Sequence, residues 1–192
     1  MEDCRVLEAC REGKYTSVLV QTHDKKYVEY RTEHFVNALG SGAGKLCDSM
    51  GIDAGLYPVR HQAFITRRLP MLGKHGTNLD MLIDRQDYKG FSAVYGQQIA
   101  YTGQIIGCAS PKLDAMRIDK NPKVNTKALL EIVREMFSEW IPDLAGVGIQ
   151  AVWAGYYTEP RYIVDPELGL FVGMRGHGFM LSQYIARMYV DK

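Results

Sequence analysis

The chain has 192 residues, of which 46% are hydrophobic and 23% are charged, and this globular composition excludes a disordered or collagen-like protein. Its 23 lysines and arginines against 22 aspartates and glutamates give a net charge of +1, which excludes the strongly basic field of most nucleic-acid-binding proteins. From this charge we expect no nucleic-acid partner. No stretch of sequence approaches the ~20 consecutive apolar residues that cross a bilayer, so we also expect no transmembrane segment.

The four cysteines, Cys4, Cys10, Cys47 and Cys108, are scattered along the chain and form no CxxC pair. Because the first residues carry no apolar signal-peptide core, we expect a reducing, cytoplasmic location with free structural thiols. No Cys or His residues have the close paired spacing of zinc ligands, so the sequence predicts no metal site.

The N-terminal segment up to Gly13 favours a short helix. Two β-rich runs follow at residues 17–22 and 27–31, and the short polar loop between them is typical of a hairpin. A third apolar run at 34–39 predicts another strand, which leads into a glycine-rich turn and a short helix ending near residue 50.

The middle of the chain is predicted to form a sheet. Residues 59–66 alternate in polarity, as a half-buried strand does. The face expected to be apolar consists of Val59, His61, Ala63 and Ile65. Three more strand candidates follow at 79–83, 90–95 and 98–107. Because polar turns separate these runs, the sequence predicts an antiparallel sheet of about four strands.

Apolar residues at three- and four-residue steps predict a helix over 127–140, capped by Asn125 or Thr126. The remaining expected elements are strands at 150–157 and 170–172 and a closing helix at 179–189. An antiparallel sheet combined with helices predicts the α+β class.

Two glycine-rich segments stand out, because glycine lets a backbone approach a ligand closely. The run from Asn37 to Gly44 follows an apolar strand, so it is either a contact for a nucleotide phosphate or an ordinary tight turn. The run from Gly173 to Leu181 opens the last helix, whose first N–H groups suit an anion or an electron-rich carbonyl; ordinary capping also explains its glycines. His177 in this run is either a ligand partner or a loop histidine.

Other side chains also leave two interpretations open. His61 is either a buried histidine that the backbone satisfies or a functional group. Arg161 follows two tyrosines and either holds a carboxylate bidentately or pairs with a neighbouring acidic residue at the surface. The phenols of Tyr95 and Tyr101 have the same ambiguity.

Taken together, these segments resemble one known family. The motifs that carry the resemblance are Asn37-Ala38-Leu39-Gly40, Trp153-Ala154-Gly155-Tyr156-Tyr157 and Gly176-His177-Gly178-Phe179. Their order resembles the D-amino-acid-oxidase-like family of FAD-dependent amine and amino-acid oxidoreductases, nearest to sarcosine oxidase β subunits and dimethylglycine dehydrogenases. The last two motifs are the more specific signal, since the Asn-Ala-Leu-Gly turn alone is weak.

The resemblance covers only the C-terminal half of that family. Family members open with a strand and a GxGxxG turn that cradles the FAD pyrophosphate, and this sequence contains no such motif. The resemblance therefore implies that residues 1–56 and 145–192 form the C-terminal part of an FAD-binding domain lacking its GxGxxG Rossmann element. Residues 57–144 would form a substrate-binding domain, an antiparallel sheet with a helix. A second polypeptide carrying the N-terminal FAD-binding half would complete the protein.

The resemblance also implies roles for individual residues. His61 and Tyr95 match active-site positions of dimethylglycine-oxidising relatives, while Arg161 and Tyr156 would bind the substrate. The expected cofactor is non-covalent FAD. Its contacts would be Asn37, Ala38, Gly40 and Ser41 at the phosphate and ribityl region, and Gly176, His177, Gly178, Phe179, Met180 and Leu181 at the flavin edge.

The implied function is oxidation of the C–N bond of an amino acid or N-methyl amino acid by hydride transfer to flavin. Such an enzyme would be inactive without the second polypeptide. The alternative from a different class is a cofactor-free remnant domain that acts as a structural or interaction protein. Flavin binding that needs both chains would favour the enzyme, and a stable chain that ignores FAD would favour the remnant.

Overall fold

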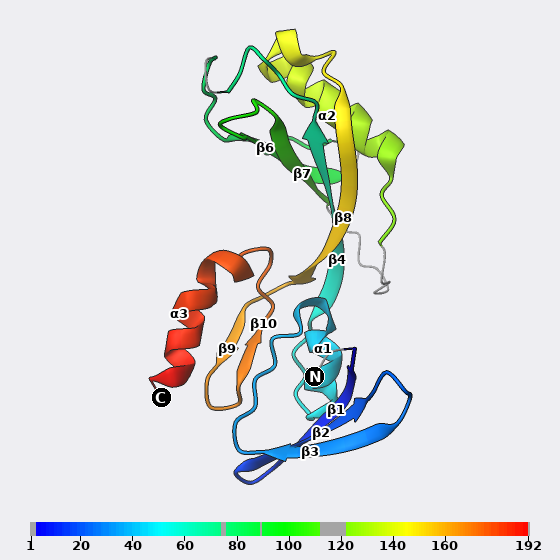
Figure 1. The fold of residues 1–192 in the computed structure, drawn as a ribbon, viewed down its shortest axis with the longest axis vertical. Coiled ribbons are helices and arrows are strands. Elements are labelled where there is room, and N and C mark those ends of the chain that lie inside the picture. Colours follow the sequence, from blue (N-terminus) through cyan, green and yellow to red (C-terminus); the bar gives the residue numbers. More distant parts are fainter. Residues whose placement is uncertain (1–2, 74–75, 89, 112–121, 192) are drawn as a thin grey trace. The chain divides into compact units, whose positions relative to one another are not determined.

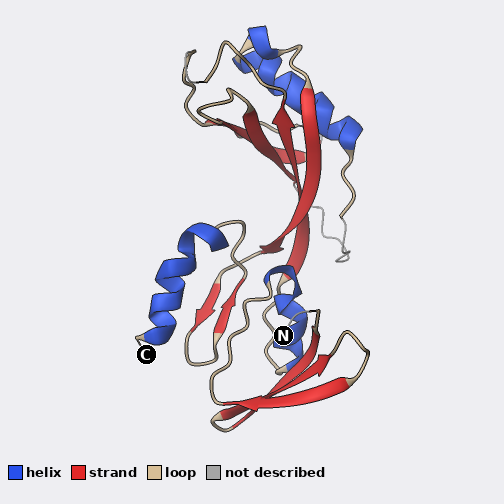
Figure 2. Cartoon of the chain, viewed as in Figure 1, coloured by secondary structure: helices blue, strands red, loops and turns tan. Residues whose placement is uncertain are grey.

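The computed structural model describes residues 3–73, 76–88, 90–111 and 122–191, and the chain forms two compact units. One unit combines residues 1–58 with 157–192, and the other is Val59–Tyr156. Both units combine strands and helices, and the antiparallel sheets with few helices confirm the expected α+β class (Figure 1, Figure 2). The assignment of FAD-binding and substrate-binding roles to parts of the chain stays a prediction.

The first unit begins with an antiparallel sheet in the order β1-β2-β3. Its strands are β1 (Arg5–Glu12), β2 (Tyr15–Gln21) and β3 (Tyr27–Thr32), so the expected hairpin is confirmed. The helix expected before Gly13 is wrong, because β1 pairs with β2 along its whole length and this pairing overrides a weak helix propensity. Gly13 has φ 62° in the tight turn between β1 and β2, a conformation that glycine adopts readily.

The run at 34–39, expected as a third strand, contributes only one parallel bridge, between Asn37 and Leu170. The Asn37 N–H donates to Gly169 O at 2.7 Å, and the Phe171 N–H donates to Asn37 O at 3.1 Å. This segment therefore lies beside β10 (Leu170–Val172), which pairs on its other side with β9 (Ile163–Asp165). The strand at 170–172 is confirmed, while the short β9 was not expected.

After the bridge, the chain passes through the 3-10 helix η1 (Gly40–Gly42) into the helix α1 (Ala43–Ser49). Ala43 and Cys47 of α1 are fully buried in a cluster with β10 residues, which ties the turn to the strands. The first unit ends with α3 (Gly178–Val190), the closing helix expected at 179–189.

The second unit is built on a five-stranded sheet in the order β5-β6-β7-β4-β8. The strands are β4 (Tyr57–Thr66), β5 (Leu82–Asp84), β6 (Phe91–Gln98), β7 (Ile105–Pro111) and β8 (Ile149–Glu159). The sheet is larger than the expected about four strands, because β8 returns from the far end of the unit to pair beside β4. Strand β7 begins only at Ile105, since the preceding residues form a turn in which Gly103 N donates to Ile99 O at 2.9 Å.

Helix α2 (Thr126–Trp140) covers one face of this sheet and confirms the expected helix. The Asn125 side chain caps it by accepting a hydrogen bond from Ala128 N at 3.3 Å, and the 3-10 helix η2 (Pro142–Leu144) follows it. The fully buried Phe64 of β4 meets Phe137 of α2 edge-on, with ring centroids 6.2 Å apart. Gly107 of β7 makes room for this packing, since an added Cβ would come within 2.5 Å of Phe64 Cζ.

The polarity alternation in β4 is correct in period but wrong in face. Gln62, Phe64 and Thr66 are buried on the α2 side, whereas His61 and Ala63 point to the other side. The polar residues are tolerated because each is bonded: Gln62 Oε1 accepts from Asn125 N at 2.6 Å, and Thr66 Oγ1 accepts from Ile105 N at 2.8 Å.

None of the helices in the described ranges combines the length and the apolar character that spanning a bilayer requires.

Candidate functional site

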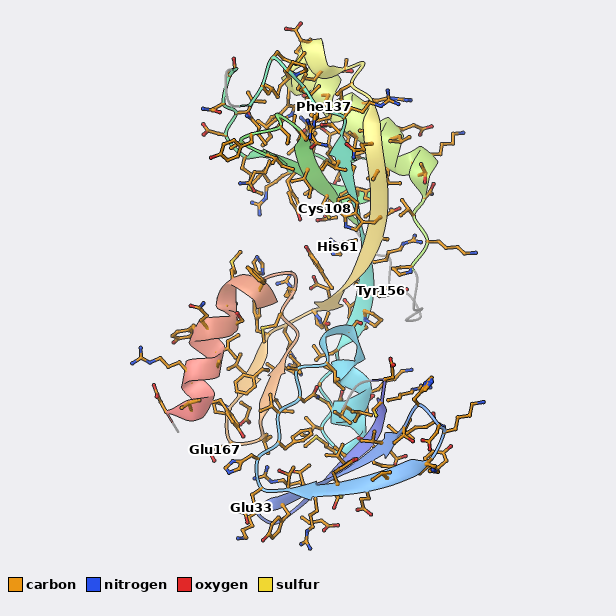
Figure 3. The ribbon with its side chains drawn as sticks, viewed as in Figure 1. Glu33, His61, Cys108, Phe137, Tyr156 and Glu167 are labelled. Atoms are coloured by element: carbon orange, nitrogen blue, oxygen red, sulfur yellow. The ribbon has the colours of Figure 1, made fainter. Side chains whose placement is uncertain are left out.

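The sheet face opposite α2 brings together the two residues expected to be catalytic. Tyr95 of β6 pairs directly with Cys108 of β7, and Cys108 pairs directly with Ala63 of β4. Directly paired residues of antiparallel strands point to the same face, and His61 lies two positions before Ala63 on that face. His61, Cys108 and Tyr95 therefore form one row across three neighbouring strands, which we call the His61–Tyr95 row. Figure 3 labels His61 and Cys108 of this row.

Cys108 is the link in this row. Its Sγ lies 4.0 Å from Nδ1 of His61, and its side chain is hydrogen-bonded with that of Tyr95. Burial raises the pKa of the Cys108 thiol above its usual value, and this effect outweighs the opposing hydrogen bond from Tyr95. The thiol is therefore neutral at neutral pH.

His61 is half-buried, and its electrostatics follow from that position. Burial lowers the pKa of His61 from 6.5 to about 4, because the charged imidazolium loses hydration there. The imidazole is thus neutral at pH 7 and has one nitrogen that donates and one that accepts a hydrogen bond. Such a group can accept a hydrogen bond from a neutral amine without adding charge to the site.

In the first unit, the turn that begins at Asn37 is shaped by that residue. The Asn37 side chain is fully buried: its Nδ2 donates to Ala43 O at 3.3 Å, and its Oδ1 accepts from Leu39 N at 3.3 Å. Asn37 therefore holds the turn in place through internal bonds. Gly40, at φ 56°, and Ser41 follow on η1, where a Cβ added to Gly40 would meet no atom within 4 Å.

The second glycine-rich turn leads into α3. Gly176 has φ 83°, and an added Cβ would come within 2.5 Å of Cζ of Tyr157, so only glycine fits. His177 is the residue before the helix, and its side chain does not cap it; its Nδ1 instead lies 2.5 Å from the Tyr162 hydroxyl. Arg175 Nε also donates to Glu159 Oε2 at 2.6 Å.

These contacts leave the start of α3 without a side-chain cap. The Leu181 N–H donates to His177 O at 3.1 Å, which is the first hydrogen bond of the helix. The N–H groups of Gly178, Phe179 and Met180 precede that bond and have no intrahelical acceptor, as at any helix N-terminus. Phe179 and Met180 are 97% and 72% exposed, so this end is open for contact with another molecule.

The expected substrate-binding residues lie in different units. Arg161 belongs to the first unit, where its Nη2 donates to Ala54 O at 3.2 Å. Tyr156 lies near the end of β8, at the last position of the second unit (Figure 3). Arg60 points away from the face of His61, and its Nη1 donates to Lys123 O at 2.6 Å. The roles of Arg161 and Tyr156 stay predictions.

Sequence reasoning missed Cys108, which it treated only as a free structural thiol. No local signal marks this residue, because its place between His61 and Tyr95 depends on the register of three strands. In the described part of the chain, no three His, Cys, Asp or Glu side chains gather closely enough to hold a metal ion.

Comparison with known proteins gives a family for this arrangement. A family model described as FAD dependent oxidoreductase (DAO) matches residues 1–192. A search of functionally curated proteins gives no significant match.

Solved structures share the fold. L-proline dehydrogenase from P. horikoshii is 26% identical with a TM-score of 0.68, and the match covers 98% of this chain and 48% of that one. Glycine oxidase from Geobacillus kaustophilus is 18% identical with a TM-score of 0.63, over 98% of this chain and 47% of that one. Amadoriase I, a fructosyl amine:oxygen oxidoreductase from Aspergillus fumigatus, is 16% identical with a TM-score of 0.68, and the match covers 97% of this chain and 44% of that one. The chain thus spans about half the length of the solved structures it matches.

The lowered pKa of His61 predicts a pH-dependent stability. Between pH 6.5 and about 4, the unfolded chain binds a proton at this residue that the folded chain does not bind. Above pH 6.5 both states are neutral at His61, and protonation there does not reduce the free energy of unfolding. As the pH falls toward 4, proton binding by the unfolded chain lowers that free energy by about 3 kcal/mol, at ~1.4 kcal/mol per pKa unit. Urea unfolding at pH 7 and pH 4.5 should therefore show a larger loss of unfolding free energy for the wild type than for His61→Gln.

The matched control is His23→Gln, because His23 is exposed in the loop between β2 and β3. This variant should keep the pH dependence of the wild type. An equal loss in the wild type and in His61→Gln would contradict the neutral, buried state assigned to His61.

Proposed function

The chain belongs to the DAO family of FAD-dependent oxidoreductases, and on that premise we propose that it forms the substrate-side half of an enzyme that oxidises the C–N bond of an amino acid or N-methyl amino acid. The observation that carries this proposal is the His61–Tyr95 row, which sets a neutral imidazole and a phenol on the same face of the sheet. The names of the similar structures support the substrate class, since they are a proline dehydrogenase, a glycine oxidase and a fructosyl amine oxidoreductase.

The proposed cofactor is non-covalent FAD, and the residues of the first unit fit it. The turn at Gly40 and Ser41 has open space where a side chain would stand, and the start of α3 carries N–H groups without a side-chain cap. An anionic or electron-rich edge is favoured at such a helix N-terminus by the helix dipole. Bound FAD would supply the redox chemistry, acceptance of a hydride from the carbon beside the amine nitrogen.

The proposed roles of the chain's own residues follow from their chemistry. An amine is oxidised in its neutral form, so the site must bind it without its extra proton. With a pKa of about 4, His61 is too weak a base to keep that proton at neutral pH, and it acts as a hydrogen-bond acceptor that orients the neutral amine. Tyr95 is proposed as the second polar contact, and Arg161 with Tyr156 as the contacts for the carboxylate.

The proposed partner is a second polypeptide that carries the dinucleotide-binding half. Helix α3 has 13 residues and buries none of them, with Phe179, Tyr184 and Val190 exposed by 97%, 68% and 76%. A helix with so many exposed apolar side chains is typical of an element that another surface covers.

The first test is the visible absorption spectrum of the purified chain, alone and co-expressed with the protein encoded next to it. We expect a flavin band only in the co-expressed sample, because each half supplies part of the FAD contacts. Anaerobic addition of free and N-methyl amino acids should bleach that band. A chain that unfolds cooperatively but carries no flavin in either sample would contradict the enzyme and favour the cofactor-free remnant.

A second test addresses the His61–Tyr95 row in the flavin-containing complex. His61→Gln should lower kcat/KM by about 10²-fold, the usual effect of misplacing a substrate, and Tyr95→Phe should also lower it. The control is His23→Gln, which should leave kcat/KM unchanged. Flavin content must stay equal among the variants, and unchanged kinetics in both His61→Gln and Tyr95→Phe would remove the row from the active site.

A third test addresses the partner surface on α3. Tyr184→Glu places a charge in the exposed apolar surface, whereas Gln183→Glu places the same charge at the adjacent polar position. Tyr184→Glu should weaken co-purification of the partner at least about tenfold, since an aromatic anchor at an interface contributes ~2 kcal/mol or more. Both variants should unfold within about 0.5 kcal/mol of the wild type when the chain is alone. Equal binding by the two variants would exclude α3 from the interface.

A further inference from the structure

The chain makes an unusual turn immediately before α3. The His177 N–H donates to Met174 O at 2.7 Å, which closes a turn of four residues at 174–177. Its two central residues, Arg175 and Gly176, both have positive φ, at 47° and 83°. Two positive φ values in succession are the mark of a type I′ turn, whose first central position is usually Asn, Asp or Gly. We call residues 174–177 the left-handed turn.

Arg175 is the residue that this turn does not favour. A left-handed backbone brings the Cβ of an L-residue too close to the following carbonyl oxygen, so arginine here costs free energy that glycine would avoid. Such a conformation persists only where the surrounding structure holds the backbone in place. Contacts made by the left-handed turn must therefore offset the cost at Arg175.

Two side-chain contacts join the left-handed turn to the stretch that leads from β8 to β9. Arg175 Nε donates to Glu159 Oε2 at 2.6 Å, and Nδ1 of His177 lies 2.5 Å from the Tyr162 hydroxyl. The Glu159 side chain is only 19% exposed, so water screens this ion pair less than it screens most surface pairs. We call these two contacts the side-chain ties.

Glycines let the same two stretches of chain approach each other closely. A Cβ added to Gly173 would overlap Arg161 O, and a Cβ added to Gly176 would overlap the ring of Tyr157. These close approaches place the left-handed turn against the stretch after β8. They do not act on Arg175, whose side chain is held by one of the ties.

We propose that the side-chain ties keep the left-handed turn closed before any cofactor binds, with Glu159 and Tyr162 as positioning residues for the backbone at the start of α3. The role toward FAD rests on the proposed function, whereas the dependence of the turn on the ties does not. A closed turn fixes the direction of the first N–H groups of α3, so bound FAD would not have to order this backbone.

The experiment is amide hydrogen exchange of the whole chain without flavin. The His177 amide is the reporter, because its bond to Met174 O exists only while the turn is closed. Tyr162→Phe and Arg175→Ala should each raise the exchange rate of this amide about threefold, the factor expected for the loss of one exposed polar contact. Unchanged exchange in both variants overturns the proposal.

A double-mutant cycle tests whether the tie itself is the cause. Glu159→Ala should raise the exchange rate as much as Arg175→Ala does, and the double variant should raise it no further, because all three lose the same contact. Effects that multiply in the double variant would contradict a tie between the two residues. Arg187→Ala is the matched control: it removes an exposed ion pair with Asp191 at the other end of α3 and should leave the His177 amide unchanged.

Glycine at position 175 separates the strain from the tie. Arg175→Gly loses the ion pair but also removes the cost of the positive φ, so its His177 amide should exchange more slowly than that of Arg175→Ala. Equal exchange in these two variants would mean that the turn carries no strain for a tie to offset, and would overturn the proposal.

Release of FAD from the flavin-containing complex, followed by flavin fluorescence after dilution, tests the role toward the cofactor. Arg175→Ala should speed this release by a similar factor of about three, because opening of the turn breaks the proposed backbone contacts. Faster amide exchange with unchanged release would overturn the role toward FAD. Absence of flavin from every sample would overturn the proposed function, and exchange at His177 would still decide whether the ties hold the turn.

Discussion

The arrangement of the second unit depends on the close approach of the Phe64 ring to Gly107. Strand β7 lies in the middle of the five-stranded sheet, and at Gly107 it has no side chain to keep the neighbouring ring away. The ring can therefore lie across β7 and reach Phe137, which fixes α2 on that face. Because successive residues of a strand point to opposite faces, the next residue, Cys108, must then face the side that α2 leaves uncovered. The packing of Phe64 against Gly107 on one face thus determines that Cys108 lies on the other face.

The contacts proposed for the two units differ in kind. In the second unit, the proposed chemistry rests on side chains, with His61 and Tyr95 on the two strands that flank and pair with β7. In the first unit, the proposed FAD contacts are made by backbone, in turns where Gly40 and Gly176 have positive φ. Side-chain contacts in these turns serve mainly to hold the backbone: Asn37 bonds internally, and His177 contacts Tyr162. The proposed reacting groups need a rigid sheet and the proposed cofactor contacts need shaped backbone, and one chain can provide both because separate elements form them.

Local features of the sequence predicted most elements, and non-local pairing explains the errors. The Asn125 cap and the apolar spacing of α2 are encoded within one stretch, so this helix is confirmed almost to the residue. The strand at β1 was expected to be helical because its partner, β2, is not visible in its own sequence. The same holds for the site. His61 and Tyr95 were identified through a family resemblance, whereas Cys108 came to light only once the register of three strands was known.

The uncovered α3 also bears on how the amount of this protein is controlled in a cell. A chain that presents Phe179, Tyr184 and Val190 to water carries a surface that aggregates or is recognised by chaperones and proteases. Covering the helix by assembly removes that surface. Copies synthesised in excess of the proposed second polypeptide would therefore be short-lived, and the abundance of the two chains would be matched without any dedicated regulator.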